Sequence, residues 1–307
     1  MQFSLLHGKP HAAIVPAFRD VSDIRVLTIG AAMNSEILVC DAAYFRIEYE
    51  INPYMDTGLQ PDVRAAIAEH EAIVGAHRAA GRHVRHISAA WECPDMVYTA
   101  NAAVVRGSRA VLGDPPPERK SEVPYFRDWL EADGFEVLEA PYPFSGQGDA
   151  LACGELLLAG YGQRTDRRMH AVLAEYLDYD ADQVVALRTI SAQWYDLDLA
   201  VAVVAADTIA YHPHALDEPS RQRLQGLHRD RGVDLVEVST AEAARFALNL
   251  VSDGATVTMT AGAPRLAADL RARGFAVVEL DTTELRKGGG GVRCTALTLD
   301  TPARRHR

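Results

Sequence analysis

Five segments of the chain carry apolar residues at helical spacing, and each leads into a short apolar run typical of a strand. The helical pattern covers residues 61–81, 124–134, 167–177, 220–230 and 263–274, and the runs cover 83–89, 135–141, 183–190, 233–239 and 275–281. A further apolar stretch follows each run. In the first four units a turn divides this stretch into two parts, a pattern that predicts a hairpin. The expected repeats are 57–113, 122–162, 167–213, 219–260 and 264–300.

A polar residue or a cysteine opens the inner strand of each unit. These residues are Asn101, Asp149, Asp198, Asn249 and Cys294, with separations of 48, 49, 51 and 45 residues. Such a period indicates a repeat architecture. The last unit lacks a partner strand, which residues 35–42 can supply, and this closure favours a ring without exposed sheet edges. We therefore expect a single domain over 1–307, with the five residues facing a central polar cavity.

Charge and cysteine usage narrow the class of protein. The chain of 307 residues has a formal net charge of -11, and its only dense basic run is the tail at 304–307, so nucleic acid and anionic membranes are not expected partners. No segment has the pattern of a signal peptide or a membrane span, which predicts a cytoplasmic protein. The four cysteines form no CxxC pair, so we expect reduced thiols and neither a metal nor a cofactor.

The stretch GGGGVRCTALTLD, residues 288–300, has three interpretations: a phosphate cradle, a nucleophile beside a strand, or a flexible turn. Phosphate-binding glycine loops open a helix, whereas the residues after these glycines alternate like a strand. No Lys-Ser or Lys-Thr pair follows either. The pattern therefore favours a cysteine held near the start of a strand by a permissive loop.

Several motifs resemble the superfamily of dimethylargininases, arginine deiminases and amidinotransferases. They are EYEINPYMD, PDMVYTANAAVV, GDALACGELLLAGYGQRTD, YDLDLAVAVV, FALNLVSDG and ELRKGGGGVRCTALTL, in the same order as in that family and within residues 24 to 300. The resemblance implies the pentein fold, an α/β five-bladed propeller of pseudo-fivefold ββαβ repeats. It also implies that a cysteine attacks a guanidinium carbon to form an amidino-thioether, which water then hydrolyses while a histidine transfers protons.

Carried over by motif, Cys294 matches the nucleophile and Asp95 a carboxylate that faces the guanidinium. Asn52 matches a residue near the pocket mouth, and Arg164 an arginine that grips the α-carboxylate of the substrate, for which a bidentate guanidinium is suited. Asn101 stands where some branches have aspartate. The substrate-binding residues expected in the central cavity also include Asp149 and Asn249.

The chain departs from the family in three places. Asp196 in WYDLDLA stands where the family has its catalytic histidine, and Ser145 and Gln147 replace two glutamates. An arginine expected in the first hairpin falls on Gly113. With a reference pKa of roughly 3.9, an aspartate is a poor proton shuttle near neutral pH, so we expect Asp196 to orient a cationic substrate in the catalytic site.

Three functions stay open from the sequence. The first is hydrolysis of an arginine derivative through Cys294, and the second an amidinotransferase-like or lyase-type reaction of the same intermediate. The third is a non-catalytic protein that binds a guanidino ligand. Simpler interpretations also exist: Cys294 as a core residue, Asp149 and Asp198 as loop caps, and Arg164 at a helix entry. His212 and His214 either occupy a loop or restore an imidazole. The expected partner is a small guanidino molecule, and homodimer formation is left open.

Overall fold

The computed structural model describes residues 33–303, and the sequence features noted before and after them lie outside the described residues. Within this part the strands form five three-stranded sheets. Four of them are continuous in sequence: β3 (Ala103–Arg106), β4 (Arg109–Leu112) and β5 (Glu136–Leu138); β6 (Ala150–Cys153), β7 (Leu156–Tyr161) and β8 (Val184–Arg188); β9 (Val201–Ala205), β10 (Thr208–Tyr211) and β11 (Asp234–Glu237); β12 (Val251–Ser252), β13 (Thr256–Thr260) and β14 (Ala276–Leu280).

The fifth sheet joins distant parts of the chain. Its middle strand, β1 (Glu36–Cys40), pairs in parallel with β2 (His83–Ile87) and antiparallel with β15 (Leu297–Thr298). The antiparallel register places Ile37 opposite Thr298 and Leu38 opposite Leu297. A strand from the start of the described chain thus completes the last repeat and closes the ring.

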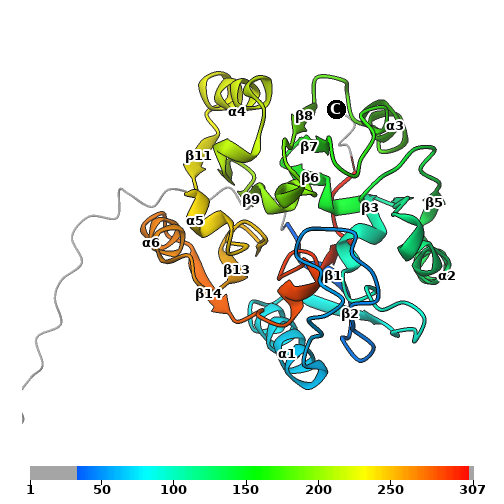
Figure 1. The fold of residues 1–307 in the computed structure, drawn as a ribbon. Coiled ribbons are helices and arrows are strands. Elements are labelled where there is room, and N and C mark those ends of the chain that lie inside the picture. Colours follow the sequence, from blue (N-terminus) through cyan, green and yellow to red (C-terminus); the bar gives the residue numbers. More distant parts are fainter. Residues whose placement is uncertain (1–32, 304–307) are drawn as a thin grey trace, which may run out of the picture. The chain divides into compact units, whose positions relative to one another are not determined.

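All five sheets follow one plan. The first two strands are antiparallel, and a helix carries the chain back so that the third strand pairs in parallel with the second. These helices are α1 (Val63–Ala79), α2 (Val123–Ala132), α3 (Met169–Tyr176), α4 (Glu218–Arg231) and α6 (Pro264–Ala272). Figure 1 shows them around the outside of the ring, while β3, β6 and β9 lie nearer its centre.

Local chemistry sets the helix boundaries. The Asp62 side chain accepts hydrogen bonds from the backbone of Arg64 and Ala65 at the start of α1, and Asp217 caps α4 in the same way. Helix α4 ends at Gly232, whose φ of 69° is the left-handed conformation that suits a glycine. A short helix, α5 (Thr240–Ala243), starts after the capping residue Ser239 and has no counterpart among the sequence predictions.

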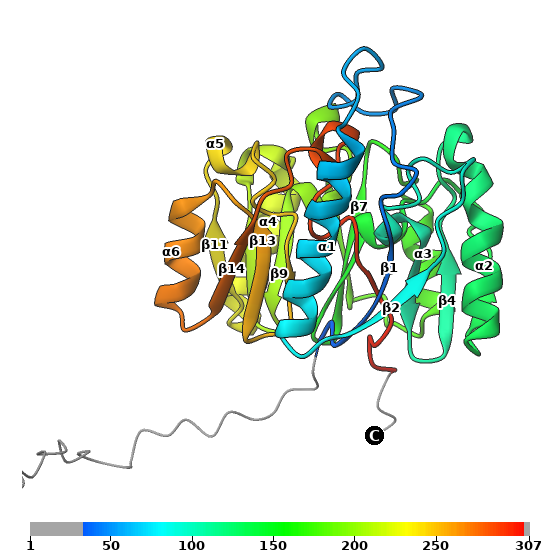
Figure 2. The same ribbon diagram turned by 90° about the horizontal axis from the view of Figure 1, so that it is seen from below.

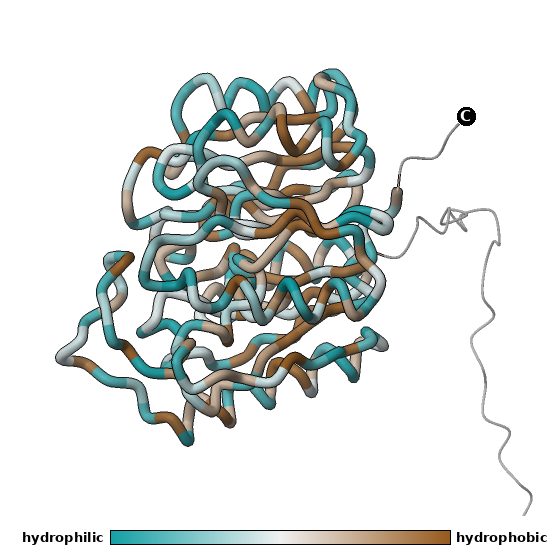
Figure 3. Tube along the Cα trace, turned by 90° about the vertical axis from the view of Figure 1, so that its right-hand side faces the viewer, coloured by the Kyte–Doolittle hydropathy of each residue, from teal (hydrophilic) through white to brown (hydrophobic). Residues whose placement is uncertain are grey.

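The strands are mostly apolar and buried, and the helices cover them with one apolar face each. Figure 3 shows the brown, hydrophobic segments gathered toward the inside of the fold and the teal ones toward its outside. Four clusters of buried apolar side chains pack between neighbouring sheets and helices. Across residues 33–303, no helix combines the length and apolarity needed to cross a membrane.

The expected fold class is confirmed: the structure has five small α/β sheets with the pseudo-fivefold ββαβ repeat of a pentein. The assignment of 1–307 to one domain stays a prediction, because residues 1–32 and 304–307 lie outside the described part. Figure 2 shows residues 41–60, in blue, extending past one end of the strands. The segment around the 3-10 helix η8 (Leu285–Gly288) lies at the same end.

Candidate active site

The five strand-opening residues all lie just before an innermost strand. Asn101 is in the 3-10 helix η2 (Thr99–Ala102) before β3, and Asp198 is in η6 (Leu197–Leu199) before β9. Asp149 directly precedes β6, Asn249 precedes β12 by two residues, and Cys294 lies in a turn before β15. All five are buried. The tight turns therefore aim these polar groups inward at the same end of five equivalent strands.

The glycine loop lets the chain pass close to other side chains before it reaches Cys294. A Cβ atom on Gly290 would collide with the ring of Tyr98, and Gly289 has a φ of 95°, which favours glycine. The Tyr195 hydroxyl donates a hydrogen bond to the carbonyl oxygen of Gly289, and Asn52 donates to that of Gly288 at 3.1 Å. This loop is thus a packed support for the cysteine and opens no helix for phosphate.

The Cys294 thiol is buried, with 2% exposure, but its surroundings are polar. The Asn249 amide Nδ2 donates to Sγ at 3.1 Å, and Sγ lies 3.5 Å from Oδ2 of Asp198, within hydrogen-bonding reach for sulfur. Asn249 Oδ1 also accepts from the backbone N–H groups of Arg293 and Cys294. Burial, followed by the charges of Asp198 and Asp196, raises the pKa of the thiol well above its ordinary value.

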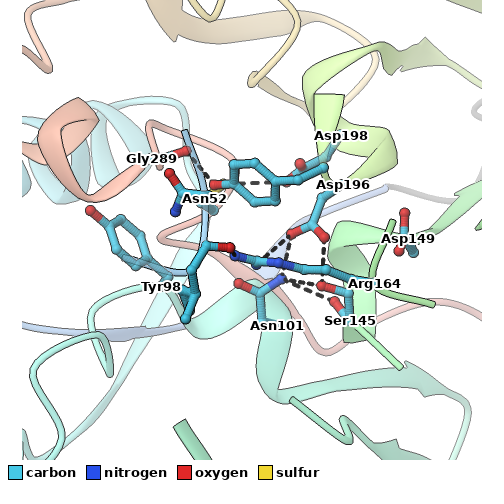
Figure 4. Close-up of polar contacts among 12 residues, drawn as sticks. Asn52, Tyr98, Asn101, Ser145, Asp149, Arg164, Asp196, Asp198 and Gly289 are labelled. Carbon is cyan, nitrogen blue, oxygen red and sulfur yellow. Dashed lines mark hydrogen bonds and ion pairs between the residues drawn. The ribbon is translucent and has the colours of Figure 1, made fainter. Parts of the chain in front are cut away.

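Asp196 is fully buried and both of its carboxylate oxygens accept hydrogen bonds (Figure 4). The Ser145 hydroxyl donates to Oδ1 at 2.7 Å, and the Asn101 amide donates to Oδ2 at 2.9 Å. Arg164 Nη1 lies 3.5 Å from the same Oδ2. The aspartate that replaces the family's histidine is therefore held by three partners, and Cys294 is not among them.

Arg164 is the least buried residue of this network, with a side chain that is 10% exposed. Its guanidinium lies 4.1 Å over the ring of Tyr195, and Nη2 donates to the backbone carbonyl of Ile51 at 3.4 Å. Ser145 and Arg164 line a cavity of about 310 Å³, together with Asp114, Lys120, Phe144 and Gln163.

Three buried carboxyls have raised pKa values. Burial, reinforced by the charge of Asp196, raises the pKa of Asp149 to about 7, although the Thr165 hydroxyl and the Leu197 N–H hydrogen-bond its oxygens. Burial likewise raises the pKa of Asp95 to about 7, against the opposing effect of Arg119. Asp198 has a pKa well above its ordinary value because of burial and then Asp196. The site is thus rich in buried acids and suited to a cationic ligand.

Sequence reasoning missed several polar residues of this region. Arg119 is buried, donates to Asn101 Oδ1 at 2.8 Å and forms a two-point ion pair with Glu122. No arginine fits at Gly113, since a Cβ there would collide with the carbonyl oxygen of Asn101. The side-chain oxygen of Gln147 accepts from Arg293 at 2.9 Å.

The period selected Asp198 for the central cavity, with a loop cap as the simpler interpretation, but it was not among the predicted catalytic or substrate-binding residues. The histidine pair lies elsewhere. His212 Nδ1 pairs with the backbone oxygen of Val238 at 2.8 Å, and its ring contacts Trp194 and His214. Both histidines line a separate cavity of about 390 Å³ with Glu237 and other residues. In the described part of the chain, no group of three or more potential ligands is arranged to hold a metal ion.

Comparison with known proteins agrees with the fold. The family model of eukaryotic N,N dimethylarginine dimethylhydrolase matches residues 51–299. The chain is 39% identical over 258 residues to an N(G),N(G)-dimethylarginine dimethylaminohydrolase of Mycobacterium tuberculosis, covering 84% of this chain and 83% of that protein. It is 33% identical to the bifunctional arginine dihydrolase/ornithine cyclodeaminase AgrE of Nostoc, of which it spans 38%.

The solved N-terminal domain of ArgZ bound to product, an arginine dihydrolase from the ornithine-ammonia cycle in Cyanobacteria, superposes with a TM-score of 0.82 at 33% identity. The match covers 87% of this chain and 98% of that domain. The protein is a pentein of the enzyme class whose members include hydrolases of guanidino C–N bonds. Within that class, the chain belongs to the dimethylarginine dimethylhydrolase family.

Proposed function

We propose that this protein hydrolyses a guanidino C–N bond of a small arginine derivative through a covalent Cys294 intermediate. The observation that carries the proposal is the set of contacts at Cys294, whose Sγ lies between the Asn249 amide and the Asp198 carboxyl. A core cysteine needs no such partners, whereas a nucleophile needs a fixed orientation and a route for its proton. Asp95, Asn101, Asp149 and Asn52 are proposed to surround the substrate.

The free site keeps Cys294 as a thiol, because burial and neighbouring acids raise its pKa. A bound guanidinium reverses this effect, since a cation next to sulfur favours the thiolate. Attack on the guanidinium carbon then forms the C–S bond, the C–N bond breaks, and an amine or ammonia leaves. Water subsequently adds to the amidino carbon, the C–S bond breaks, and a urea-type product and free Cys294 result.

The hydrogen bonds of Asp196 support a second possible reaction of the same covalent intermediate. Because its oxygens are occupied by Ser145, Asn101 and Arg164, it does not replace an imidazole as a base for water. A covalent intermediate that water attacks slowly is open to an amine acceptor, as in amidino transfer.

The proposal includes a cytoplasmic location, which fits the four free and buried cysteines. It also includes assembly of the protein as a homodimer.

Mass spectrometry of the intact protein with arginine, dimethylarginine and other guanidines tests the proposal. We expect an amidino adduct on Cys294 and a urea-type product, both lost in Cys294→Ser. Adding primary amines separates hydrolysis from transfer, because only transfer gives a new guanidine. If no guanidine gives either an adduct or a product, the proposed function is wrong.

A further inference from the structure

Asp198 has a position that none of the roles above uses. It is 1% exposed, its Oδ2 faces Cys294 Sγ at 3.5 Å, and its Oδ1 has no hydrogen-bond partner in the described part of the chain. A buried carboxyl oxygen without a partner is costly unless function requires it. Asp196 and Asp149 differ, because both oxygens of each accept hydrogen bonds. Asp95 Oδ1 also lacks a hydrogen-bond partner among the described residues, but the carboxyl hydrogen-bonded to Cys294 Sγ is that of Asp198.

We propose that Asp198 carries the proton in this enzyme: it takes the proton of the Cys294 thiol and delivers it to the departing amine. The inference rests on the proposed function and assigns to Asp198 the task that the family's histidine performs elsewhere. It follows from contact geometry, since Asp198 is the carboxyl within reach of Sγ. Its second oxygen is free to face a substrate nitrogen.

The step balances in atoms and charge. As the sulfur attacks the guanidinium carbon and the C–S bond forms, the thiol proton moves to the Asp198 carboxylate. When the C–N bond breaks, the same proton moves to the leaving nitrogen, so a neutral amine departs and the carboxylate is regenerated. The positive charge of the substrate stays on the amidino-thioether. No oxidant, metal or further reactant is needed.

The surroundings of Asp198 allow both of its protonation states. Burial, followed by the charges of Asp196 and Asp149, opposes its ionisation and raises its pKa, whereas Arg293 and the hydrogen bond with Cys294 favour the anion. Arg293, Asp198 and Gln147 line one cavity. Arg293 forms no salt bridge with a carboxylate among the described residues. Its guanidinium donates hydrogen bonds to the uncharged oxygens of Gln147, Ala296 and Thr298. Arg293 therefore supports the anionic form of Asp198, which the scheme requires before the first proton transfer and after the second.

The decisive variant is Asp198→Asn, which keeps the shape of the side chain but accepts no proton. We expect adduct formation with guanidines to fall by about 10²- to 10⁴-fold, the usual contribution of a positioned acid or base. Alkylation of Cys294 by iodoacetamide should persist and move to lower pH, since the neighbouring anion is removed. An isothiourea, whose leaving group is a thiolate that needs no proton, should lose less rate in the variant than a guanidine does, because only the transfer from the Cys294 thiol is still required.

Several results overturn the inference. Unchanged or faster adduct formation from guanidines in Asp198→Asn excludes a proton-carrying role, and so does equal loss with guanidines and isothioureas. Asp198→Glu retains the carboxyl, so it must keep more guanidine activity than the asparagine variant. If the wild type forms no adduct with any guanidine, the proposed function fails separately. The interaction between Asp198 and Cys294 is then still tested by alkylation with iodoacetamide. If the alkylation rates of the wild type and Asp198→Asn depend on pH in the same way, that interaction is contradicted.

Discussion

Arg164 and Asp196 form a nearly buried ion pair, with 3.5 Å between Nη1 and Oδ2. The pair joins a residue matched to recognition of a substrate carboxylate with the aspartate that replaces a histidine. An anionic substrate tail must therefore compete with Asp196 for the same guanidinium. The substitution at position 196 alters recognition of the substrate as well as proton transfer.

Asp196→Asn should improve the binding of guanidines that carry a carboxylate. We expect the KM for arginine to fall by about tenfold, equivalent to 1.4 kcal/mol, because Arg164 loses its internal anion. Agmatine, which lacks the carboxylate, serves as the matched substrate, and its KM should change little. Equal changes for both substrates would contradict competition for Arg164.

Hydrolysis of arginine and dimethylarginine by the wild type should be slow. Loss of a proton-transferring imidazole costs about 10² to 10⁴ in rate, so the Cys294 adduct should accumulate and be seen in a rapidly quenched sample. Asp196→His should raise citrulline formation. Citrulline production by the wild type at the median enzyme rate of about 10 per second would refute this prediction.

Binding of a guanidinium should strengthen as the pH rises through 7. Burial raises the pKa of Asp95 to about 7, so this carboxyl is neutral below that pH and becomes an anion above it. We expect affinity for a non-reactive guanidinium to increase by up to about tenfold per pH unit for one released proton. Calorimetry between pH 6 and 8 measures it, with Cys294→Ser to prevent reaction. Asp95→Asn should flatten the slope, and an unchanged slope would exclude Asp95.

Two buried histidines should weaken the fold in acid. Burial lowers the pKa of His70 to about 4 and that of His77 to about 3, from an unfolded value near 6.5. Stability is therefore complete above about pH 6.5 and is lost as the pH falls toward the folded values, by about 3 kcal/mol for His70 alone. His70→Leu should flatten the loss in urea unfolding measured between pH 7 and 4.5. The exposed His83→Gln is the control and should follow the wild type.

Gly290→Ala should displace the nucleophile. Its added Cβ would strike the Tyr98 ring and lie 3.0 Å from the Cβ of Cys294, so the loop must shift. We expect lower thermal stability and loss of Cys294 alkylation by iodoacetamide. Gly75→Ala is the matched control, because nothing lies within 4 Å of its added Cβ in helix α1. It should stabilise the protein by about 0.5–1 kcal/mol. Normal alkylation in Gly290→Ala would show that the loop has room.

The sequence predicted the repeated elements well, because each depends on local spacing and capping. Helix α4 begins at Glu218, before the predicted 220, since Asp217 provides the cap and Pro219 fits the first turn. Strand β15 has only two residues, although the apolar run is longer. The preceding segment forms a turn, with the backbone N–H groups of Arg293 and Cys294 bonded to Asn249.

The pairing of polar groups within the site was less accessible to sequence reasoning. The period placed Asp198 and Cys294 at equivalent positions, but the contact between them depends on which turn brings its side chain across the axis. Asp196 lies two residues away and faces Arg164 and Ser145 instead. Partners from different repeats leave no joint pattern along the chain. The roles of the individual site residues consequently remain predictions for the experiments above.

The pairing of β1 with β15 determines how late in synthesis the fold can be completed. Ser35 and Asp300, 265 residues apart, hydrogen-bond at the edge of this sheet, so the ring closes only after nearly the whole described chain has been made. Cys294 lies in the segment that completes the closure. A chain that stops before residue 294 therefore lacks both the nucleophile and the strand that closes the ring.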